Sequence, residues 1–171
     1  MLLLLDRDSC DAELEELFSR LSIFDRPQTL DQINPADYFD ECDDDADIEY
    51  ELHQIALSSL RVESTRLGLC FIFKSREDYL LTHKMVPAGD GSFIVEQIAF
   101  FDRGFLDYQR FQGILPGGME FGVGRNDSIY QAIGKPLATR IIYEMVVDLF
   151  IIENRIVNFG FSYEGQLIHV H

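Results

Sequence analysis

The segment 37–51 carries the highest density of charged side chains in the chain. Nine of its fifteen residues are acidic and none is basic, so removing those nine would change the formal net charge from −16 to −7. Three aspartates match the first ligand positions of an EF-hand calcium loop: Asp43, Asp45 and Asp47. Ile48 stands where that loop needs glycine and Gln54 where it needs glutamate, so we expect no calcium site here.

The same segment is a candidate binding site for a positively charged protein. Clustered charge accelerates encounter with an oppositely charged partner by about 10- to 1,000-fold at low salt. Aromatic side chains lie among and beside the acids, and such side chains are suited to be buried anchors inside a charged rim. The predicted partner-binding residues are Asp37, Tyr38, Asp40, Glu41, Asp43, Asp44, Asp45, Asp47 and Glu49.

Other residues that could do chemistry form less complete patterns. His169 and His171 would point the same way in a strand, which leaves a two-ligand metal site open, but no third ligand is identifiable in the sequence. Gly122 and Gly124 suggest a nucleotide-binding loop, but Asp127 stands where the third glycine is needed. Because no nucleophile or paired-carboxylate signature stands out, we predict a protein that is not an enzyme, with no cofactor and no metal.

The composition restricts the classes of partner. With 171 residues, of which 47% are hydrophobic, the chain is long enough to form one domain with a sizeable core, so we expect a single domain over 1–171. Its net charge of −16 disfavours binding to nucleic acid or to anionic membranes. The three cysteines are widely spaced, and the sequence shows no signal peptide, so we expect a cytoplasmic protein.

Hydrophobic periodicity predicts the elements of the first hundred residues. Apolar residues at helical spacing predict an amphipathic helix over 10–22, with Ser9 as its N-cap. Residues 52–64 fit either a helix or a strand. Alternating residues over 67–73 predict a strand that is apolar on both faces. Two further strands are predicted, over 79–83 and 93–101.

The remaining residues predict a joint followed by strands. Leu115-Pro-Gly-Gly118 is typical of a turn, and a short helix over about 125–133 should end at Gly134 and Pro136. A three-strand antiparallel meander follows, with a two-residue turn at Glu153 and Asn154: 142–152, 155–163 and 167–170. The expected class is therefore α+β, with antiparallel sheet, an N-terminal helix, the short helix and the C-terminal meander.

The order of these turns resembles that of a protein family. Leu115-Pro-Gly-Gly-Met-Glu-Phe, Arg125-Asn-Asp127 and Ile133-Gly-Lys-Pro136 precede the strand meander. They are similar to the Leu-Pro-x-Gly-Leu-x-Phe, Ser-Arg-x-Asp and Leu-Gly-x-Pro pattern of bacterial immunity-type proteins of polymorphic toxin systems. The likeness covers roughly residues 10–170, and Gly124 stands where serine is common. It implies a protein that binds and neutralises a toxin made by the same or a neighbouring cell, as in contact-dependent inhibition.

We therefore expect a cytoplasmic immunity protein whose partner is a cognate toxin domain. The acidic segment favours a basic, nuclease-like toxin that is neutralised by occlusion. The alternative is a small-ligand-binding or adaptor protein that uses the face of its β-sheet.

Overall fold

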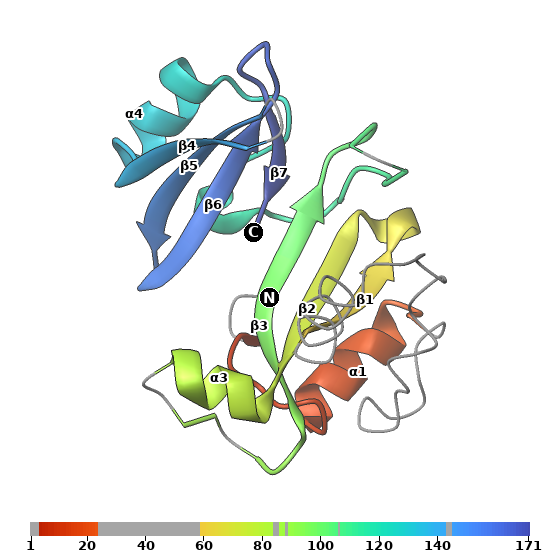
Figure 1. The fold of residues 1–171 in the computed structure, drawn as a ribbon. Helices are drawn as coiled ribbons and strands as arrows, with labels where there is room; N and C mark the ends of the chain where they lie inside the picture. The colour runs from red at the N-terminus through yellow and green to blue at the C-terminus, as the bar shows by residue number, and fades with distance from the viewer. Residues whose placement is uncertain (1–3, 24–58, 84–85, 88, 106, 143–144) are drawn as a thin grey trace, which may run out of the picture. The chain divides into compact units, whose positions relative to one another are not determined.

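The fold is that of the predicted α+β class. A computed structural model describes residues 4–23, 59–83, 86–87, 89–105, 107–142 and 145–171. One antiparallel sheet has the strand order β1-β2-β3-β7-β6-β5-β4 (Figure 1). The strands are β1 (Ser59–Ser64), β2 (Leu69–Ser75), β3 (Phe93–Phe101), β4 (Ala138–Ile142), β5 (Met145–Ile152), β6 (Arg155–Phe161) and β7 (Leu167–Val170). No helix among the described residues is both long and apolar enough to cross a membrane.

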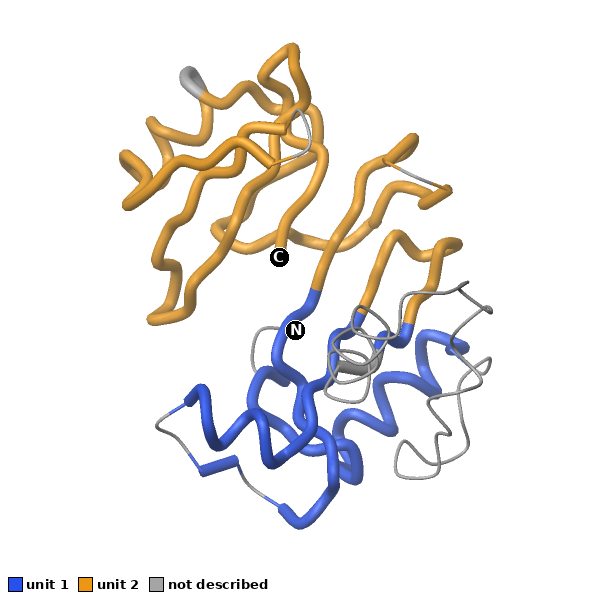
Figure 2. The backbone as a smooth tube through the Cα atoms, in the orientation of Figure 1, with its two compact units in different colours: residues 1–62, 71–98 blue, residues 63–70, 99–171 orange. Residues whose placement is uncertain are grey.

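The chain divides into two compact units that are not continuous in sequence. Unit 1 comprises residues 1–62 and 71–98, and unit 2 comprises residues 63–70 and 99–171 (Figure 2). The strands β2 and β3 therefore each contribute residues to both units.

The predicted N-terminal helix is α1 (Ala12–Arg20), and its apolar face is buried. Phe18 is fully buried, and its ring lies edge-on to that of Phe71 with centroids 4.9 Å apart. The predicted cap at Ser9 is wrong, because the helix begins at Ala12 and Ser9 lies two residues before the N-cap position. Asp11 caps the helix instead, and its carboxylate accepts hydrogen bonds from the amides of the second and third helical residues.

The strand predicted over 79–83 is also wrong, because these residues belong to a helix. Helix α3 (Arg76–Thr82) begins at Ser75, whose hydroxyl accepts a hydrogen bond from the Asp78 amide and donates one to the Asp78 carboxylate. This reciprocal arrangement resembles a capping box, which outweighs the short run Tyr79–Leu81 in the segment predicted as a strand. The strands predicted over 67–73 and 93–101 are confirmed as β2 and β3, with the start of β2 displaced to Leu69.

The C-terminal meander is confirmed, but the structure adds a strand to it. Strands β5, β6 and β7 pair in sequence order, and Glu153 and Asn154 take positive φ values of 51° and 62° in the turn between β5 and β6. The predicted start of the strand over 142–152 is wrong, because β5 begins at Met145. Ile142 ends β4, which runs antiparallel to β5 in an unbroken register from Ala138↔Leu149 to Ile142↔Met145.

The joint between the two strand-rich regions has the predicted turn and helix. Gly117 has a φ of 71° inside the 3₁₀ turn Pro116–Gly118. A π-helical turn (Arg125–Ile129) then leads into α4 (Tyr130–Ile133), and Gly134 follows with a φ of 90°. Ile129 is buried as expected, whereas Ala132 is exposed and does not belong to the buried face.

Gly68 allows a close approach of backbone segments within unit 2. Its φ is 64°, and a Cβ atom at this position would lie 2.1 Å from the Gln109 carbonyl oxygen and 2.6 Å from the Phe111 nitrogen. The Gly68 carbonyl also accepts a hydrogen bond from the Phe101 amide. Glycine is therefore required here by both conformation and space.

We predict that Gly68→Ala lowers the free energy of unfolding by about 2 kcal/mol or more, because backbone atoms must move in addition to the left-handed strain. Gly104→Ala is the matched control, since Gly104 has a φ of 87° but nothing within 4 Å of the added Cβ. It should cost only about 1 kcal/mol. Urea unfolding of both variants tests this, and equal losses would contradict the packing argument.

Candidate functional site

Negative charge is concentrated in unit 1. By sequence this unit holds 21 acidic and seven basic residues, a net charge of −14, whereas unit 2 holds nine acidic and seven basic residues, a net charge of −2. All nine residues of the predicted partner-binding site belong to this acidic unit and lie outside the described residues. Their prediction therefore rests on the sequence.

Asp148 is the centre of the densest polar cluster in unit 2. Its side chain is fully buried on β5, and the Arg125 guanidinium donates to both carboxylate oxygens through Nε at 2.7 Å and Nη2 at 2.8 Å. The hydroxyls of Tyr130 and Thr139 donate to the same carboxylate. The cluster thus joins the π-helical turn, α4 and β4 to the middle of β5.

Hydrogen bonding decides the charge state of this cluster. Burial alone would raise the pKa of Asp148, but the hydrogen bonds from Arg125, Thr139 and Tyr130 outweigh it and hold the pKa below its ordinary value. The hydrogen bond to Asp148 likewise raises the pKa of Arg125. Both groups are therefore charged at neutral pH, and each is satisfied by the other. Such a bidentate pair is suited to hold the fold together.

A cavity of about 330 Å³ lies beside this cluster. Its lining comes from the start of the π-helical turn, from β5, from the end of β6 and from the β6–β7 connection: Gly124, Arg125, Val146, Phe161, Ser162, Tyr163, Glu164 and Gly165. The Arg125 guanidinium lies 5.9 Å from the Phe161 ring centroid, so the lining combines an aromatic ring with a cation that is already paired. Tyr163, which also lines the cavity, is 97% exposed.

The two C-terminal histidines point to the same side of the sheet, as predicted. This side is opposite to the one that carries the Asp148 side chain. His169 stacks on Phe101 with centroids 4.9 Å apart, and the His169 and His171 rings are also 4.9 Å apart. The Asn158 side chain lies 3.2 Å from His171 Nε2, and His171 Nδ1 is buried without a hydrogen-bond partner. No group of three potential ligand side chains suited to a metal ion occurs among the described residues. The pair therefore remains a two-ligand arrangement.

Both histidines are held in the neutral form. Burial lowers the pKa of His169 from 6.5 to about 3, and the neighbouring His171 adds to this shift. Burial also lowers the pKa of His171. A proton on either ring would place an unpaired charge against aromatic and apolar neighbours.

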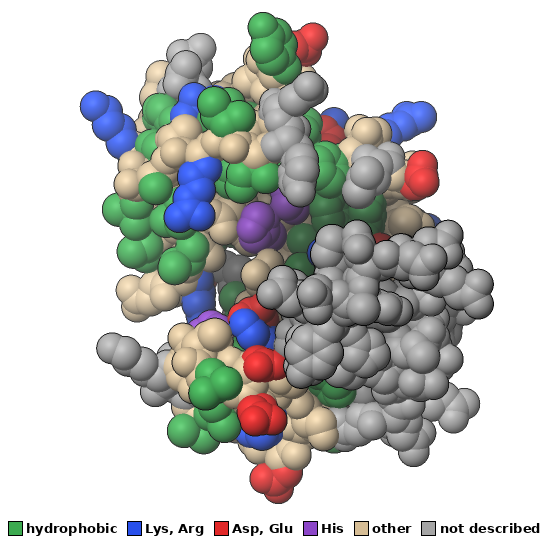
Figure 3. Space-filling view, viewed as in Figure 1, with side chains coloured by type: hydrophobic (Ala, Val, Ile, Leu, Met, Phe, Trp, Pro, Cys, Tyr) green, Lys and Arg blue, Asp and Glu red, His purple; other side chains and the backbone are tan. Residues whose placement is uncertain are grey.

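The same side of the strands continues as an apolar surface. Ile151 and Ile156 are opposite each other in the β5–β6 register and are 59% and 65% exposed. They share the face of Asn158 and His171, because residues two apart on a strand point the same way. Apolar side chains gather over β5 and β6 in the view of Figure 3.

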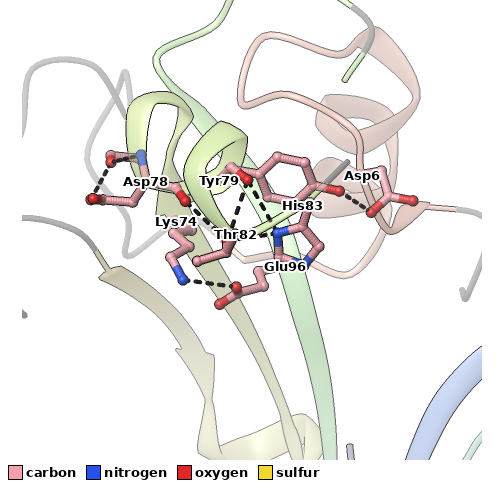
Figure 4. A network of polar contacts seen from close by, with 8 residues as sticks. Asp6, Lys74, Asp78, Tyr79, Thr82, His83 and Glu96 are labelled. Atoms are coloured by element: carbon pink, nitrogen blue, oxygen red, sulfur yellow. Dashed lines mark hydrogen bonds and ion pairs between the residues drawn. The ribbon is translucent and has the colours of Figure 1, made fainter. Parts of the chain in front are cut away.

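Unit 1 contains a second polar network, around helix α3. Tyr79 is buried, its hydroxyl donates to the Asp6 carboxylate, and its ring stacks on that of His83 with centroids 4.1 Å apart (Figure 4). The Thr82 hydroxyl contacts His83 Nδ1 at 2.8 Å. Lys74 and Glu96 form an ion pair at 3.2 Å across β2 and β3. The hydrogen bond from Tyr79 to Asp6 ties α3 to the N-terminal residues.

The sequence pattern did not identify Asp148 or its partners. An aspartate between two apolar stretches, Met145–Val147 and Leu149–Ile152, was a usable signal, since a charged residue inside a buried strand is almost always paired. Its partner Arg125 lies 23 positions away on another element, and Thr139 lies on a strand that was not predicted. Comparison of the chain with protein-family models, curated proteins and solved structures yields no match.

We predict that Asp148→Ala destabilises the fold by about 3–5 kcal/mol, because it leaves the Arg125 cation and two hydroxyls without their partner. The control is Glu13→Ala, which removes an ion pair with Arg7 from an exposed position. That change should cost less than about 1 kcal/mol. Chemical unfolding measures both, and a similar loss in the two variants would contradict a stabilising role of the buried pair.

A second prediction concerns pH. Because His169 stays neutral in the folded state down to about pH 3, the unfolded chain binds the extra proton as the pH falls below 6.5. Stability should then fall with decreasing pH by at most about 1.4 kcal/mol per unit from this residue. His169→Phe keeps a planar apolar ring in the stack and should flatten the profile between pH 6.5 and 4.5. Parallel stability curves for the two proteins would disprove the assignment.

Proposed function

We propose that this protein is an immunity-type protein that acts in the cytoplasm by binding a basic toxin domain and occluding it. The observation that carries the proposal is the unequal distribution of charge, with a net charge of −14 on unit 1 and −2 on unit 2. A charge needed only for solubility has no reason to be concentrated in one unit. A surface that attracts a positively charged protein, by contrast, requires negative charge to be concentrated in one place.

The segment 37–51 is the proposed contact region within unit 1. Its nine acids supply most of the excess charge of that unit. A nuclease active surface is built to hold phosphates and is therefore rich in lysine and arginine, so a dense run of carboxylates is complementary to it. Long-range attraction of this kind mainly increases the association rate and depends strongly on ionic strength.

The motif that carries the family resemblance has structural roles, which agrees with a binding surface elsewhere. The Arg125 guanidinium is paired with the Asp148 carboxylate. Gly117 and Gly134 adopt the positive φ values that their turns require. These residues would then be shared among proteins of one scaffold whose contact surfaces differ. The resemblance supports the class of protein, whereas the charge distribution supports the location of the site.

A second candidate function is favoured by the surface of the sheet. The cavity beside Arg125 and the exposed apolar residues of β5 and β6 would suit a small-ligand-binding or adaptor protein. The two proposals differ in the salt dependence of binding. Binding to an apolar face is insensitive to moderate salt, whereas attraction of a basic partner to acidic residues weakens as salt is added.

The test uses the C-terminal domain encoded by the neighbouring upstream gene as the probe. We expect it to bind the full chain and to lose its toxicity on co-expression. Replacing Asp43, Asp44 and Asp45 by Lys should slow association by roughly 10- to 100-fold at low salt and reduce the salt dependence. Stopped-flow or surface-based kinetics at several ionic strengths measures this.

The matched control reverses three exposed acids of unit 2 and so changes the net charge equally: Asp107, Glu120 and Glu153. If only total charge matters, both triple variants will slow association alike, and the assignment of the site to 37–51 fails. If the probe does not bind the unaltered chain at any salt concentration, the immunity function itself is rejected for that partner.

A further inference from the structure

Strand β4 forms one edge of the sheet. It is the terminal strand in the sheet order and pairs with β5 along its whole length. An edge strand presents a row of backbone N–H and C=O groups that can pair with a further strand. All five residues of β4 are exposed.

This edge lacks two of the features that usually prevent strand pairing. Its register with β5 has no bulge, and no proline lies within it. Its single charged residue is Arg140. Large apolar side chains are exposed on it and beside it, with Leu137 at 66%, Ile141 at 80% and Ile142 at 40%. A monomer that left such a strand uncovered would be prone to edge-to-edge association.

The buried cluster of unit 2 holds β4 in a fixed position. The Thr139 hydroxyl donates to Asp148, and Arg125 Nη2 donates to the Thr139 hydroxyl at 3.3 Å. The strand is therefore ordered before any partner arrives, which reduces the conformational entropy lost on pairing.

Charge and register indicate what covers this edge. Residues 135–142 include Lys135 and Arg140 but no acid, so a basic toxin domain is disfavoured here. Unit 2 contains β4 and has a net charge of only −2, so electrostatic repulsion between two copies of this unit is small. In antiparallel pairing about a two-fold axis, one residue lies opposite itself and its neighbours pair symmetrically.

The register centred on Thr139 is complementary. In this register Leu137 of each copy lies opposite Ile141 of the other copy, so the apolar pair occurs twice. Arg140 of each copy lies opposite Ala138 of the other copy. Centring on Arg140 would oppose two guanidinium groups, which is destabilising. We propose that two copies of this chain associate through β4 in antiparallel orientation about a two-fold axis at Thr139, which makes the two sheets continuous.

The experiment is sedimentation velocity of the full-length chain over a range of concentrations. We expect a monomer–dimer equilibrium, and Ile141→Glu should weaken it roughly 100-fold, about tenfold for each of the two symmetric contacts. The matched control is Leu81→Glu on α3, where the leucine is 79% exposed, and this variant should dimerise like the unaltered chain. Both sites are exposed, so neither change should unfold the protein.

A cross-linking measurement gives a second readout. In a chain with Cys10 and Cys42 replaced by Ser, the double variant L137C/I141C should form a covalent dimer under mild oxidation. The L81C variant in the same background should not. The proposal is overturned if the unaltered chain is monomeric at all concentrations, if the two glutamate variants dissociate equally, or if the double cysteine variant stays monomeric while dimer is present.

Discussion

The carboxylate of Asp148 constrains the architecture of unit 2 more than any other group described in it. It is fully buried, and it accepts four hydrogen bonds from Arg125, Tyr130 and Thr139. A buried charge without partners would be very costly, so the three elements that donate to it must be in place together. The π-helical turn, α4 and β4 carry few buried apolar residues of their own. Their positions therefore depend on a polar contact that is satisfied only in the complete fold. The same contact removes Arg125 from the set of residues available for binding.

The two units differ in charge, and this difference organises the proposed functions. Unit 1 is strongly acidic and is where the binding of a basic partner is proposed, whereas unit 2 is close to neutral and contains the edge strand proposed for self-association. Segregation of this kind lets one chain attract a positively charged protein without repelling its own copy at the same short-range contact. The buried neutral histidines belong to the nearly neutral unit, where a charge would have no compensating partner.

The sequence predicted those elements whose signals are local and strong. β3 was predicted with its observed bounds because Phe93–Phe101 is long and apolar, and the β5–β6 turn was predicted because Glu153-Asn154 suits a two-residue hairpin. The helix α3 was missed because the three apolar or aromatic residues Tyr79–Leu81 outweighed the capping signal of Ser75. The strand β4 was missed because residues 141–147 are apolar or aromatic apart from Glu144 and include no glycine, proline or asparagine to indicate a turn. The buried ion pair joins residues far apart in sequence, so no local pattern could indicate it, and the acidic segment remains a sequence-based prediction.

The position of β7 in the sheet has a consequence for the order of assembly. Among the strands that the structure describes, Leu167–Val170 is synthesised after all the others, yet it lies between β3 and β6 in the sheet order. Phe100 pairs with Val170 on one side and Phe159 pairs with the same residue on the other. Until β7 is in place, β1–β3 and β4–β6 form two separate pieces with unpaired inner edges. The nascent chain must therefore keep both edges protected until residue 170 has been synthesised, and misassembly is favoured before that point.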